Sequence, residues 1–334
     1  MIKLGFIGLG GMGRFQLNAF AGIRGCRIVA GSDLVVPARA DFTASHPAAR
    51  VFEDYEKLLA DPGVDAVVVA VPTLHHKQVA VDALAHRKPV LVEKPLARTV
   101  ADGRKMIEAA GKHRTLLMVA HCRRYDPVWG AWAKVVQCGR LGQPVLWRHA
   151  MAGLGPANPW FMDARVGGGP LIDGAVHNYD FANMLWGDPQ SVVASTLKFN
   201  PRVTATDTGS AVVRYQSGNQ LLVSWSWASR GAGLFDVIGP KGSIQSGSGS
   251  LKLPPGSDNE RTLFCHTDLG GKARLIQVRQ GFATMYRNQA RHFLDCIRGA
   301  VSCRTPATEA IKAVAVAEAI LKAGPQGRAG KVAW

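Results

Sequence analysis

Residues 8–13 read Gly8-Leu9-Gly10-Gly11-Met12-Gly13 and directly follow the apolar run Leu4-Gly5-Phe6-Ile7. This G-x-G-x-x-G pattern is typical of a tight strand-to-helix turn at which backbone N–H groups approach a pyrophosphate. The aligned peptide dipoles at the start of a following helix favour negative charge there. Because Arg14–Ala21 has helical spacing, the motif has the required context and predicts a dinucleotide-binding unit that uses Gly8, Gly10, Gly11, Met12 and Gly13.

An acidic residue at the end of the next apolar run indicates which dinucleotide is bound. Asp33 lies twenty residues after Gly13, where a carboxylate can accept hydrogen bonds from both hydroxyls of the adenosine ribose. This favours NAD, because the 2′-phosphate of NADP would meet like charge. Arg39 and Ser32 are close enough in the sequence that NADP remains an alternative.

Short apolar runs alternate with longer amphipathic stretches up to about residue 120, which predicts βαβ units and a parallel, doubly wound sheet of the Rossmann type. The expected strands are Leu4–Gly8, Arg27–Asp33, Ala66–Val71, Pro89–Val92 and Thr115–Val119. The expected helices are Arg14–Ala21, Pro37–Ala44, Tyr55–Ala60, Lys77–Ala85 and Ala101–His113.

The pattern changes after residue 120 to that of an α+β domain. A helix is expected over Pro127–Cys138, and two more over Met285–Arg298 and Thr308–Ala323. The expected strands are Pro144–Met151, Val192–Phe199, Gly209–Gln216, Gln220–Ala228 and Leu234–Ile238, with hairpin turns at 217–219 and 239–242. The chain is therefore an α/β protein with two expected domains, 1–120 for dinucleotide binding and 121–334 for substrate binding and oligomerisation.

Composition excludes several other classes of protein. The 334 residues are 47% hydrophobic, enough for a substantial core, yet no uninterrupted apolar run approaches the roughly 20 residues of a membrane span. The N-terminus runs straight into the glycine-rich turn and leaves no room for a signal peptide. We expect a soluble, cytoplasmic protein.

The charged residues and cysteines do not indicate nucleic-acid or metal binding. The formal net charge is +16, but Lys and Arg occur mostly singly or in pairs, so attraction for anionic cofactors and substrates is the simpler interpretation. The six cysteines are scattered, without a zinc-ligand spacing. We expect reduced thiols, no metal, and neither a nucleic-acid nor a membrane partner.

Lys94 is a candidate for chemistry because of its place at the end of a strand. Glu93-Lys94-Pro95 follows the apolar run Pro89–Val92, so Lys94 is expected at the carboxyl edge of the sheet, where ligands of open α/β folds bind. There it can reach a substrate oxygen, although a single lysine is also an ordinary surface residue.

A second candidate follows the run Gly167-Gly168-Gly169. Asp173 and His177 are four residues apart and share one face of an expected helix, which Asp180 extends. Either they serve chemistry or they form a structural pair. Gly174 at a helical position costs about 1 kcal/mol relative to Ala, so it serves either the close approach of a ligand or tight packing of the helix on a sheet.

Taken in order, these segments resemble the Gfo/Idh/MocA family over nearly the whole chain. The resemblance rests on the glycine-rich turn, Val71-Pro72-Thr73-Leu74-His75-His76, Glu93-Lys94-Pro95, Arg123-Arg124-Tyr125-Asp126-Pro127, Gly167-Gly168-Gly169 and Asp173-x-x-x-His177. It implies a Rossmann domain, a C-terminal domain with a large open and mainly antiparallel sheet, and NAD(P)-dependent oxidoreduction of sugars, inositols and related molecules.

The resemblance also assigns roles to individual residues. It implies that Lys94, Asp173 and His177 are catalytic and that the Lys94–Pro95 bond is cis. The residues that it places beside the cofactor are Pro72, Thr73, His76, Glu93, Lys94 and Trp160. The family often has Asn where this chain has Thr73, so that contact is the least secure. The side chains expected to contact substrate are Lys94, Arg124, Trp160, Arg165, Asp173 and His177.

Together these features suggest hydride transfer between a ring secondary alcohol of a sugar or inositol-like polyol and nicotinamide. In this hypothesis His177 takes the hydroxyl proton, Lys94 polarises the same oxygen, and Asp173 orients His177 or binds a neighbouring hydroxyl. The alternatives are an NAD-dependent glycosidase or other enzyme that recycles its hydride, and a non-catalytic cofactor-sensing regulator. A homodimer or homotetramer is expected.

Overall fold

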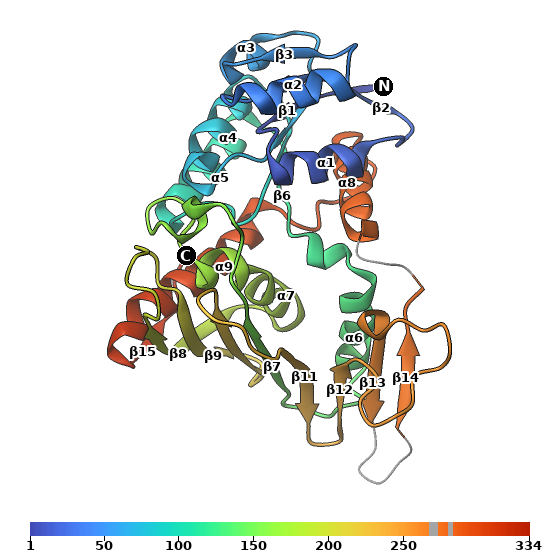
Figure 1. The fold of residues 1–334 in the computed structure, drawn as a ribbon, viewed down its shortest axis with the longest axis vertical. Coiled ribbons are helices and arrows are strands. Elements are labelled where there is room, and N and C mark those ends of the chain that lie inside the picture. The colour runs from blue at the N-terminus through green and yellow to red at the C-terminus, as the bar shows by residue number, and fades with distance from the viewer. Residues whose placement is uncertain (267–272, 280–282) are drawn as a thin grey trace. The chain divides into compact units, whose positions relative to one another are not determined.

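The computed structural model describes the chain except for residues 267–272 and 280–282, and it contains two compact units (Figure 1). The first unit comprises Met1–Cys122 and Tyr286–Ile311, and the second comprises Arg123–Met285 and Lys312–Trp334. The expected domain boundary at residue 120 is close to the point, after Cys122, at which the chain first passes from one unit to the other. The segment 286–311, which the sequence placed in the second domain, is grouped with the first unit instead.

Helix α8 explains this grouping, because one of its apolar residues packs on helix α1. The Phe293 ring meets the Phe20 ring edge to face with centroids 6.4 Å apart, and the Arg287 guanidinium donates to the Ala21 carbonyl at 3.0 Å. Such contacts between segments far apart in sequence were not visible in the pattern of either segment alone.

Within residues 1–122 the strands form one six-stranded parallel sheet in the order β3-β2-β1-β4-β5-β6. Its strands are β1 (Ile2–Ile7), β2 (Cys26–Ser32), β3 (Arg50–Phe52), β4 (Ala66–Val69), β5 (Val90–Val92) and β6 (Leu117–Val119). The helices of this unit are α1 (Gly11–Phe20), α2 (Val36–Ser45), α3 (Tyr55–Ala60), α4 (His76–Ala85), α5 (Val100–His113) and α8 (Ala283–Ile297). The expected doubly wound sheet is confirmed; the short strand β3 was not expected.

Strands β4 and β5 read as unbroken apolar runs because helices cover both faces of a parallel sheet. Every residue of both strands is buried, with at most 1% of its surface exposed. The strand order reverses between β1 and β4, and ligands of open α/β sheets bind outside the carboxyl ends of the strands at such a reversal. We therefore expect the ligand at the turns that follow β1, β2, β4 and β5.

The second unit contains a mixed, mostly antiparallel sheet of nine strands in its described residues, in the order β14-β13-β12-β11-β7-β10-β9-β8-β15. Only β7 and β10 pair in parallel among these strands. Its strands are β7 (Leu146–Ala152), β8 (Pro189–Leu197), β9 (Thr208–Tyr215), β10 (Gln220–Ser226), β11 (Leu234–Gly239), β12 (Gly242–Ser246), β13 (Thr262–His266), β14 (Arg274–Gln277) and β15 (Ala329–Lys331). The expected open sheet is confirmed, with four strands, β12 to β15, added.

Helices α6 (Pro127–Gln137) and α7 (Val176–Trp186) pack on this sheet, while α9 (Ala307–Ala323) runs across the division between the units. Aromatic rings make the contact. The ring centroids of Trp132 on α6 and Trp147 on β7 are 4.9 Å apart, and those of Trp129 on α6 and Phe181 on α7 are also 4.9 Å apart. Both expected hairpin turns are confirmed, since β9 leads directly to β10 and Gly239 pairs with Gly242.

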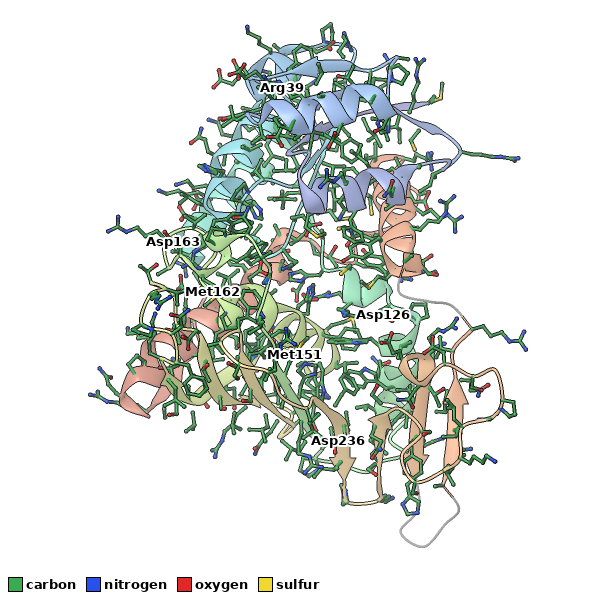
Figure 2. The ribbon with its side chains drawn as sticks, viewed as in Figure 1. Arg39, Asp126, Met151, Met162, Asp163 and Asp236 are labelled. Carbon is green, nitrogen blue, oxygen red and sulfur yellow. The ribbon has the colours of Figure 1, made fainter. Side chains whose placement is uncertain are left out.

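The other face of the nine-stranded sheet carries exposed apolar side chains. Val193, Leu197 and Leu234 expose 44%, 56% and 42% of their surface, respectively. Asp236 of β11, which Figure 2 labels, lies on the same face of the sheet as Leu234. Among the described residues, no helix has the length and apolar character needed to cross a membrane.

Candidate functional site

The glycine-rich turn after β1 needs glycine for two separate reasons. Gly8 has φ of 91°, and a Cβ there would lie 2.6 Å from the Ala70 carbonyl, while a Cβ on Gly13 would lie 2.1 Å from the Gly8 oxygen. These two glycines let strand and helix pack. A Cβ on Gly10 or Gly11 would meet nothing within 4 Å, so that side of the turn is open for a ligand to approach the backbone.

Helix α1 begins at this open side without a capping side chain. Its N-cap is Gly10, which makes no side-chain hydrogen bond, and its first turn contains no acidic residue. The first N–H groups of a helix have no partner within the helix and carry the positive end of its dipole. The turn is thus suited to hold the pyrophosphate of a dinucleotide, as the sequence predicted.

Asp33 stands at the end of β2 and reaches back to the glycine-rich turn. Its Oδ2 accepts the Leu9 N–H at 2.7 Å and its Oδ1 accepts the Val35 N–H at 2.8 Å. A carboxylate offers about four acceptor positions, so both oxygens keep capacity for the two hydroxyls of a ribose. These bonds also orient the carboxylate beside the turn.

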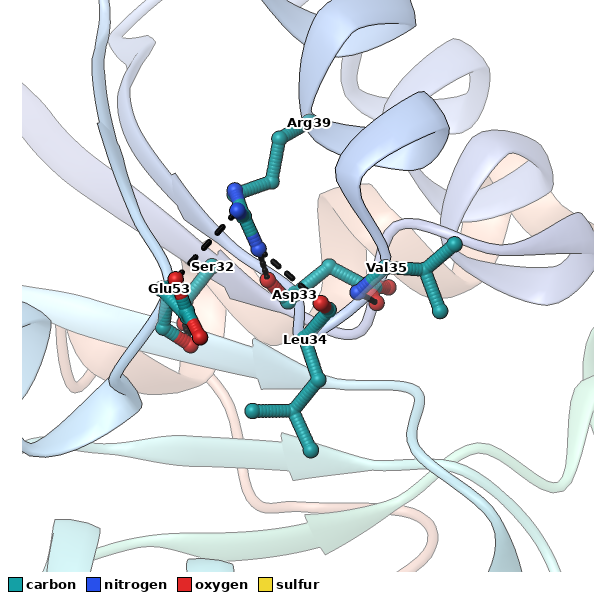
Figure 3. Close-up of polar contacts among 6 residues, drawn as sticks. All are labelled: Ser32, Asp33, Leu34, Val35, Arg39 and Glu53. Carbon is teal, nitrogen blue, oxygen red and sulfur yellow. Dashed lines mark hydrogen bonds and ion pairs between the residues drawn. The ribbon is translucent and has the colours of Figure 1, made fainter.

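Arg39 is one of the two residues for which NADP remained an alternative, and its guanidinium is bound by other protein groups (Figure 3). Its Nη1 donates to the carbonyls of Asp33 and Leu34 at 2.7 and 3.0 Å, and its Nη2 lies 3.3 Å from Glu53 Oε2. Ser32 is buried and donates to the Glu53 carbonyl at 3.3 Å. Both side chains are engaged by neighbouring protein groups, so the local geometry favours NAD.

Lys94 follows β5 on a turn that other buried side chains hold in place. The Lys94–Pro95 bond is cis, as the family resemblance implied. Glu93 is 5% exposed; its Oε1 accepts from Gln16 Nε2 at 2.6 Å and its Oε2 accepts the Lys94 N–H at 3.2 Å. Gln16 was not predicted from the sequence. Its only sequence signal is that it is a polar residue on the otherwise apolar face of α1.

His76 joins the turn after β4 to the turn after β5. Its ring nitrogens lie 2.8 Å from the Pro95 carbonyl oxygen and 3.0 Å from that of Val71, and the residue is 1% exposed. Thr73 is also buried, at the start of a short 3-10 turn that follows Pro72. His76 is therefore a positioning residue for the Lys94 turn, and cofactor contacts of Pro72, Thr73 and His76 stay predictions.

In the second unit, Asp173 and His177 lie on consecutive helical segments. Asp173 is in a π-helical turn over Pro170–Gly174 and is buried, and His177 is in the first turn of α7 and half-buried. The helical context predicted for the pair is present, although the helix changes type between them. A catalytic role for either residue stays a prediction.

Gly174 has a packing role. A Cβ at this position would lie 2.7 Å from the Trp225 ring and 3.2 Å from the Trp227 ring. The indole Nε1 of Trp225 in turn donates to Asn178 Oδ1 at 3.1 Å. Of the two explanations that the sequence left open, tight packing on the sheet is the one observed, and the indoles fill the space that a ligand would need.

Arg124 is bound to Asp180 through a bidentate ion pair inside the second unit. Arg124 Nε and Nη2 donate to the two carboxylate oxygens of Asp180 at 2.8 and 2.7 Å, and the side chains are 6% and 1% exposed. Asp180 thus does more than extend the face of Asp173 and His177. The ion pair occupies one edge of the Arg124 guanidinium, so a substrate contact by Arg124 stays a prediction.

Trp160 and Arg165 lie in the irregular segment between β7 and α7. Trp160 is half-buried and stacks on the Phe161 ring with centroids 3.7 Å apart, and Arg165 is exposed. Asp163, labelled beside Met162 in Figure 2, accepts the Arg165 N–H at 2.7 Å. Nothing in this local arrangement tests their expected substrate contacts.

His149 on β7 was not singled out from the sequence. Its ring stacks on that of Trp225 with centroids 5.8 Å apart and meets the Phe235 ring edge to face at 5.7 Å. Burial, with a smaller effect of Arg123, lowers the pKa of His149 to about 4. The ring is therefore neutral near pH 7 and serves the aromatic core.

We expect His149 to make the second unit less stable in acid. Because its folded pKa is below the ordinary 6.5, its stabilising effect is complete above pH 6.5 and is lost between pH 6.5 and about 4. The loss is roughly 1–3 kcal/mol. All eight tryptophans belong to the second unit, so fluorescence-monitored urea unfolding measures it. His149→Phe should flatten the curve in this window, and an unchanged curve would contradict the assignment.

A strand order of 3-2-1-4-5-6, an open glycine-rich turn and an oriented acidic residue after β2 define the first unit as an NAD-binding dehydrogenase domain. The family described as "Oxidoreductase family, NAD-binding Rossmann fold" matches residues 2–121, and "GFO/IDH/MocA C-terminal domain" matches residues 130–245. The chain belongs to the Gfo/Idh/MocA family and is an NAD-dependent oxidoreductase that acts on CH–OH groups.

Relatives match over nearly the full length of the chain. Inositol 2-dehydrogenase 1 and inositol 2-dehydrogenase 2 of Saccharopolyspora erythraea are 28% and 30% identical; the matches cover 98% and 99% of this chain and 95% of each relative. A levoglucosan dehydrogenase solved with NADH and levoglucosan is similar in fold, with a TM-score of 0.87, 20% identity and full coverage of both chains.

Proposed function

We propose that the protein transfers a hydride between NAD and a ring secondary alcohol of a sugar or cyclic polyol of the inositol type. The observation that carries the proposal is the placement of Lys94 at the carboxyl edge of the parallel sheet, on a turn braced by Glu93 and His76. Full-length similarity to proteins named inositol 2-dehydrogenase supports this substrate class.

Each residue of the proposed machinery has a separate task. Bound NAD supplies the hydride acceptor at nicotinamide C4. The Lys94 ammonium holds and polarises the reacting oxygen, His177 takes the hydroxyl proton, and Asp173 orients His177 or binds a neighbouring hydroxyl. Trp160 borders the nicotinamide end of the cofactor, and Arg165 with Arg124 contributes to substrate recognition.

A panel of inositols, aldoses, anhydrosugars and glycosides tests this proposal through the appearance of NADH. Turnover with one or more cyclic polyols or monosaccharides supports it. Cleavage of a glycosidic bond without net NADH would instead identify a hydride-recycling enzyme. Tight NAD binding with no turnover on any member would identify a cofactor-sensing regulator and overturn the proposal.

We expect Asp33 to set the cofactor preference. Asp33→Asn keeps the shape of the side chain but removes its charge, so kcat/KM with NAD should fall by about ten- to a hundredfold, the scale of a lost charged hydrogen bond. The ratio of NADP to NAD activity should rise, and more so when Glu53→Gln releases Arg39 from its ion pair. Steady-state kinetics with both cofactors measures the effect.

The exposed acidic residue Asp41 gives a matched control for this prediction, because it pairs with Arg14 and both side chains are largely exposed. Asp41→Asn should leave the cofactor preference unchanged. A wild-type enzyme that strongly preferred NADP would defeat the role given to Asp33.

We also propose that copies of the chain associate through the open face of the nine-stranded sheet. Register brings Val193, Val212, Leu222 and the Arg148–Asp236 ion pair into one row on this face. Exposed apolar patches of this kind are typical of interfaces between subunits. Light scattering gives the mass in solution, and a monomer at micromolar concentration would contradict this proposal.

A further inference from the structure

Three potential metal ligands meet at the end of helix α8, and none of them is a residue assigned to NAD or substrate. His292 and Cys296 are four residues apart on α8, and Cys303 follows in the loop that leads to α9. One ring nitrogen and the two sulfur atoms lie within 4.8 Å of one another, and each residue is half-buried. This is the only such group found among the described residues.

The distance between two of these ligand atoms matches that of a tetrahedral zinc site. Cys296 Sγ lies 3.4 Å from His292 Nε2. In tetrahedral Zn²⁺ sites, with Zn–S of about 2.3 Å and Zn–N of about 2.0 Å, neighbouring sulfur and nitrogen ligands are roughly 3.5 Å apart. The side chains of Cys296 and Cys303 are within hydrogen-bond distance of each other. Cys296 and His292 are therefore spaced as two ligands of one ion, and the Cys303 sulfur lies within 4.8 Å of both ligand atoms.

We propose that His292, Cys296 and Cys303 bind one Zn²⁺ ion and that a water molecule completes its coordination. Two sulfurs and one imidazole favour a thiophilic ion such as Zn²⁺ over Mg²⁺ or Ca²⁺, which prefer oxygen ligands. Two thiolates balance the charge of the ion, so the Arg304 side chain next to Cys303 does not oppose binding by net repulsion. Partial exposure of all three ligands gives the ion and its water access.

One hydrogen bond must rearrange for the ion to bind. The Arg304 N–H donates to His292 Nε2 at 2.9 Å, so it shares the nitrogen that would face the metal. The N–H belongs to the loop rather than to a helix or strand, and water can replace the ring as its acceptor because the contact is exposed.

The metal site would restrict the motion of the loop between α8 and α9, which runs along the edge of the parallel sheet. Thr305, two residues after Cys303, accepts the Val119 N–H of β6 through its carbonyl at 2.9 Å, and Pro306 forms a bridge with Met118. An ion coordinated by Cys303 and by two residues of α8 would therefore link α8 to the segment that borders β6. We infer a structural role, in which the ion stabilises the first unit.

Cobalt binding tests the site without relying on catalysis. Reduced protein, kept free of oxygen, is titrated with Co²⁺, which gives thiolate charge-transfer and tetrahedral d–d absorption, and then with Zn²⁺ in competition. One equivalent should bind, and Zn²⁺ should displace the cobalt signal. Saturating Zn²⁺ should raise the midpoint of thermal unfolding of the first unit by about 5 °C.

Conservative variants separate this site from nonspecific binding. Cys296→Ser and Cys303→Ser should each lower Zn²⁺ affinity by at least about a hundredfold, more than the loss of an outer-shell partner, while NAD binding shows that each variant is folded. Cys26→Ser changes a half-buried thiol of the same unit and should leave metal binding intact. The proposal is overturned if wild type gives no tetrahedral signal or if both site variants bind as wild type does.

Discussion

Replacing Lys94 with Met, or His177 with Gln, is expected to lower turnover at least about a hundredfold, because each removes a group that moves or stabilises charge at the reacting oxygen. Lys94→Met keeps the aliphatic stem and loses only the ammonium, so substrate binding should suffer less than kcat. His177→Gln keeps a hydrogen-bonding side chain but cannot take a proton. Stopped-flow and steady-state NADH formation with the best substrate of the panel measure both effects.

Matched variants at the end of α5 provide the control for these two changes. Lys112→Met and His113→Gln make the same chemical replacements at the last turn of a helix that is not assigned to the active site. Their turnover should stay within a factor of about two of wild type, the scale of ordinary surface changes. If Lys94→Met and His177→Gln were folded, bound NAD and kept full turnover, the proposed mechanism would be wrong.

A pH profile distinguishes proton transfer from simple positioning. If His177 is the base, the acid limb of the kcat profile should disappear in His177→Gln, because no group titrates there to take the hydroxyl proton. Asp173→Asn should lower kcat less than His177→Gln and leave an acid limb, since it acts on His177 or on a neighbouring hydroxyl. An unchanged acid limb in His177→Gln would assign the proton to another group.

The first unit could be predicted well because its signals are local in sequence. Gly8 and Gly13 are required by backbone contacts within a few residues of the turn or on the next strand of the sheet, and the acidic residue after β2 lies at a characteristic spacing from them. The buried runs of β4 and β5 follow from a sheet that is covered on both faces. Local patterns therefore sufficed to predict the fold of this unit and its binding of the cofactor.

The remaining features depend on contacts between distant segments. Gly174 was compatible with either a ligand or a packed helix, and only the Trp225 and Trp227 rings, fifty residues further along the chain, decide between them. Similarly, His292, Cys296 and Cys303 have no standard zinc-finger spacing, so their approach depends on how the loop after α8 folds back. Sequence periodicity carries no information on contacts between such distant segments.

The Arg124–Asp180 ion pair leads to the second large prediction, which concerns stability. Both side chains are almost fully buried, so removing one partner takes a bidentate ion pair away from the other charge in a low-dielectric environment. Asp180→Asn or Arg124→Met should each lower the free energy of unfolding of the second unit by about 3–5 kcal/mol. Tryptophan fluorescence during urea unfolding reports on this unit, because it contains every tryptophan of the chain.

The double variant Arg124→Met/Asp180→Leu separates the cost of an unpaired charge from the value of the pair itself. Replacing a buried ion pair by apolar residues of similar size is often neutral, so the double variant should recover most of the stability that either single variant loses. The exposed Arg14–Asp41 pair is the comparison, and Asp41→Asn should cost less than about 1 kcal/mol. If the double variant were as unstable as the sum of the single variants, the two side chains would stabilise the unit through independent contacts, and the pair would not be the reason that Arg124 is held beside α7.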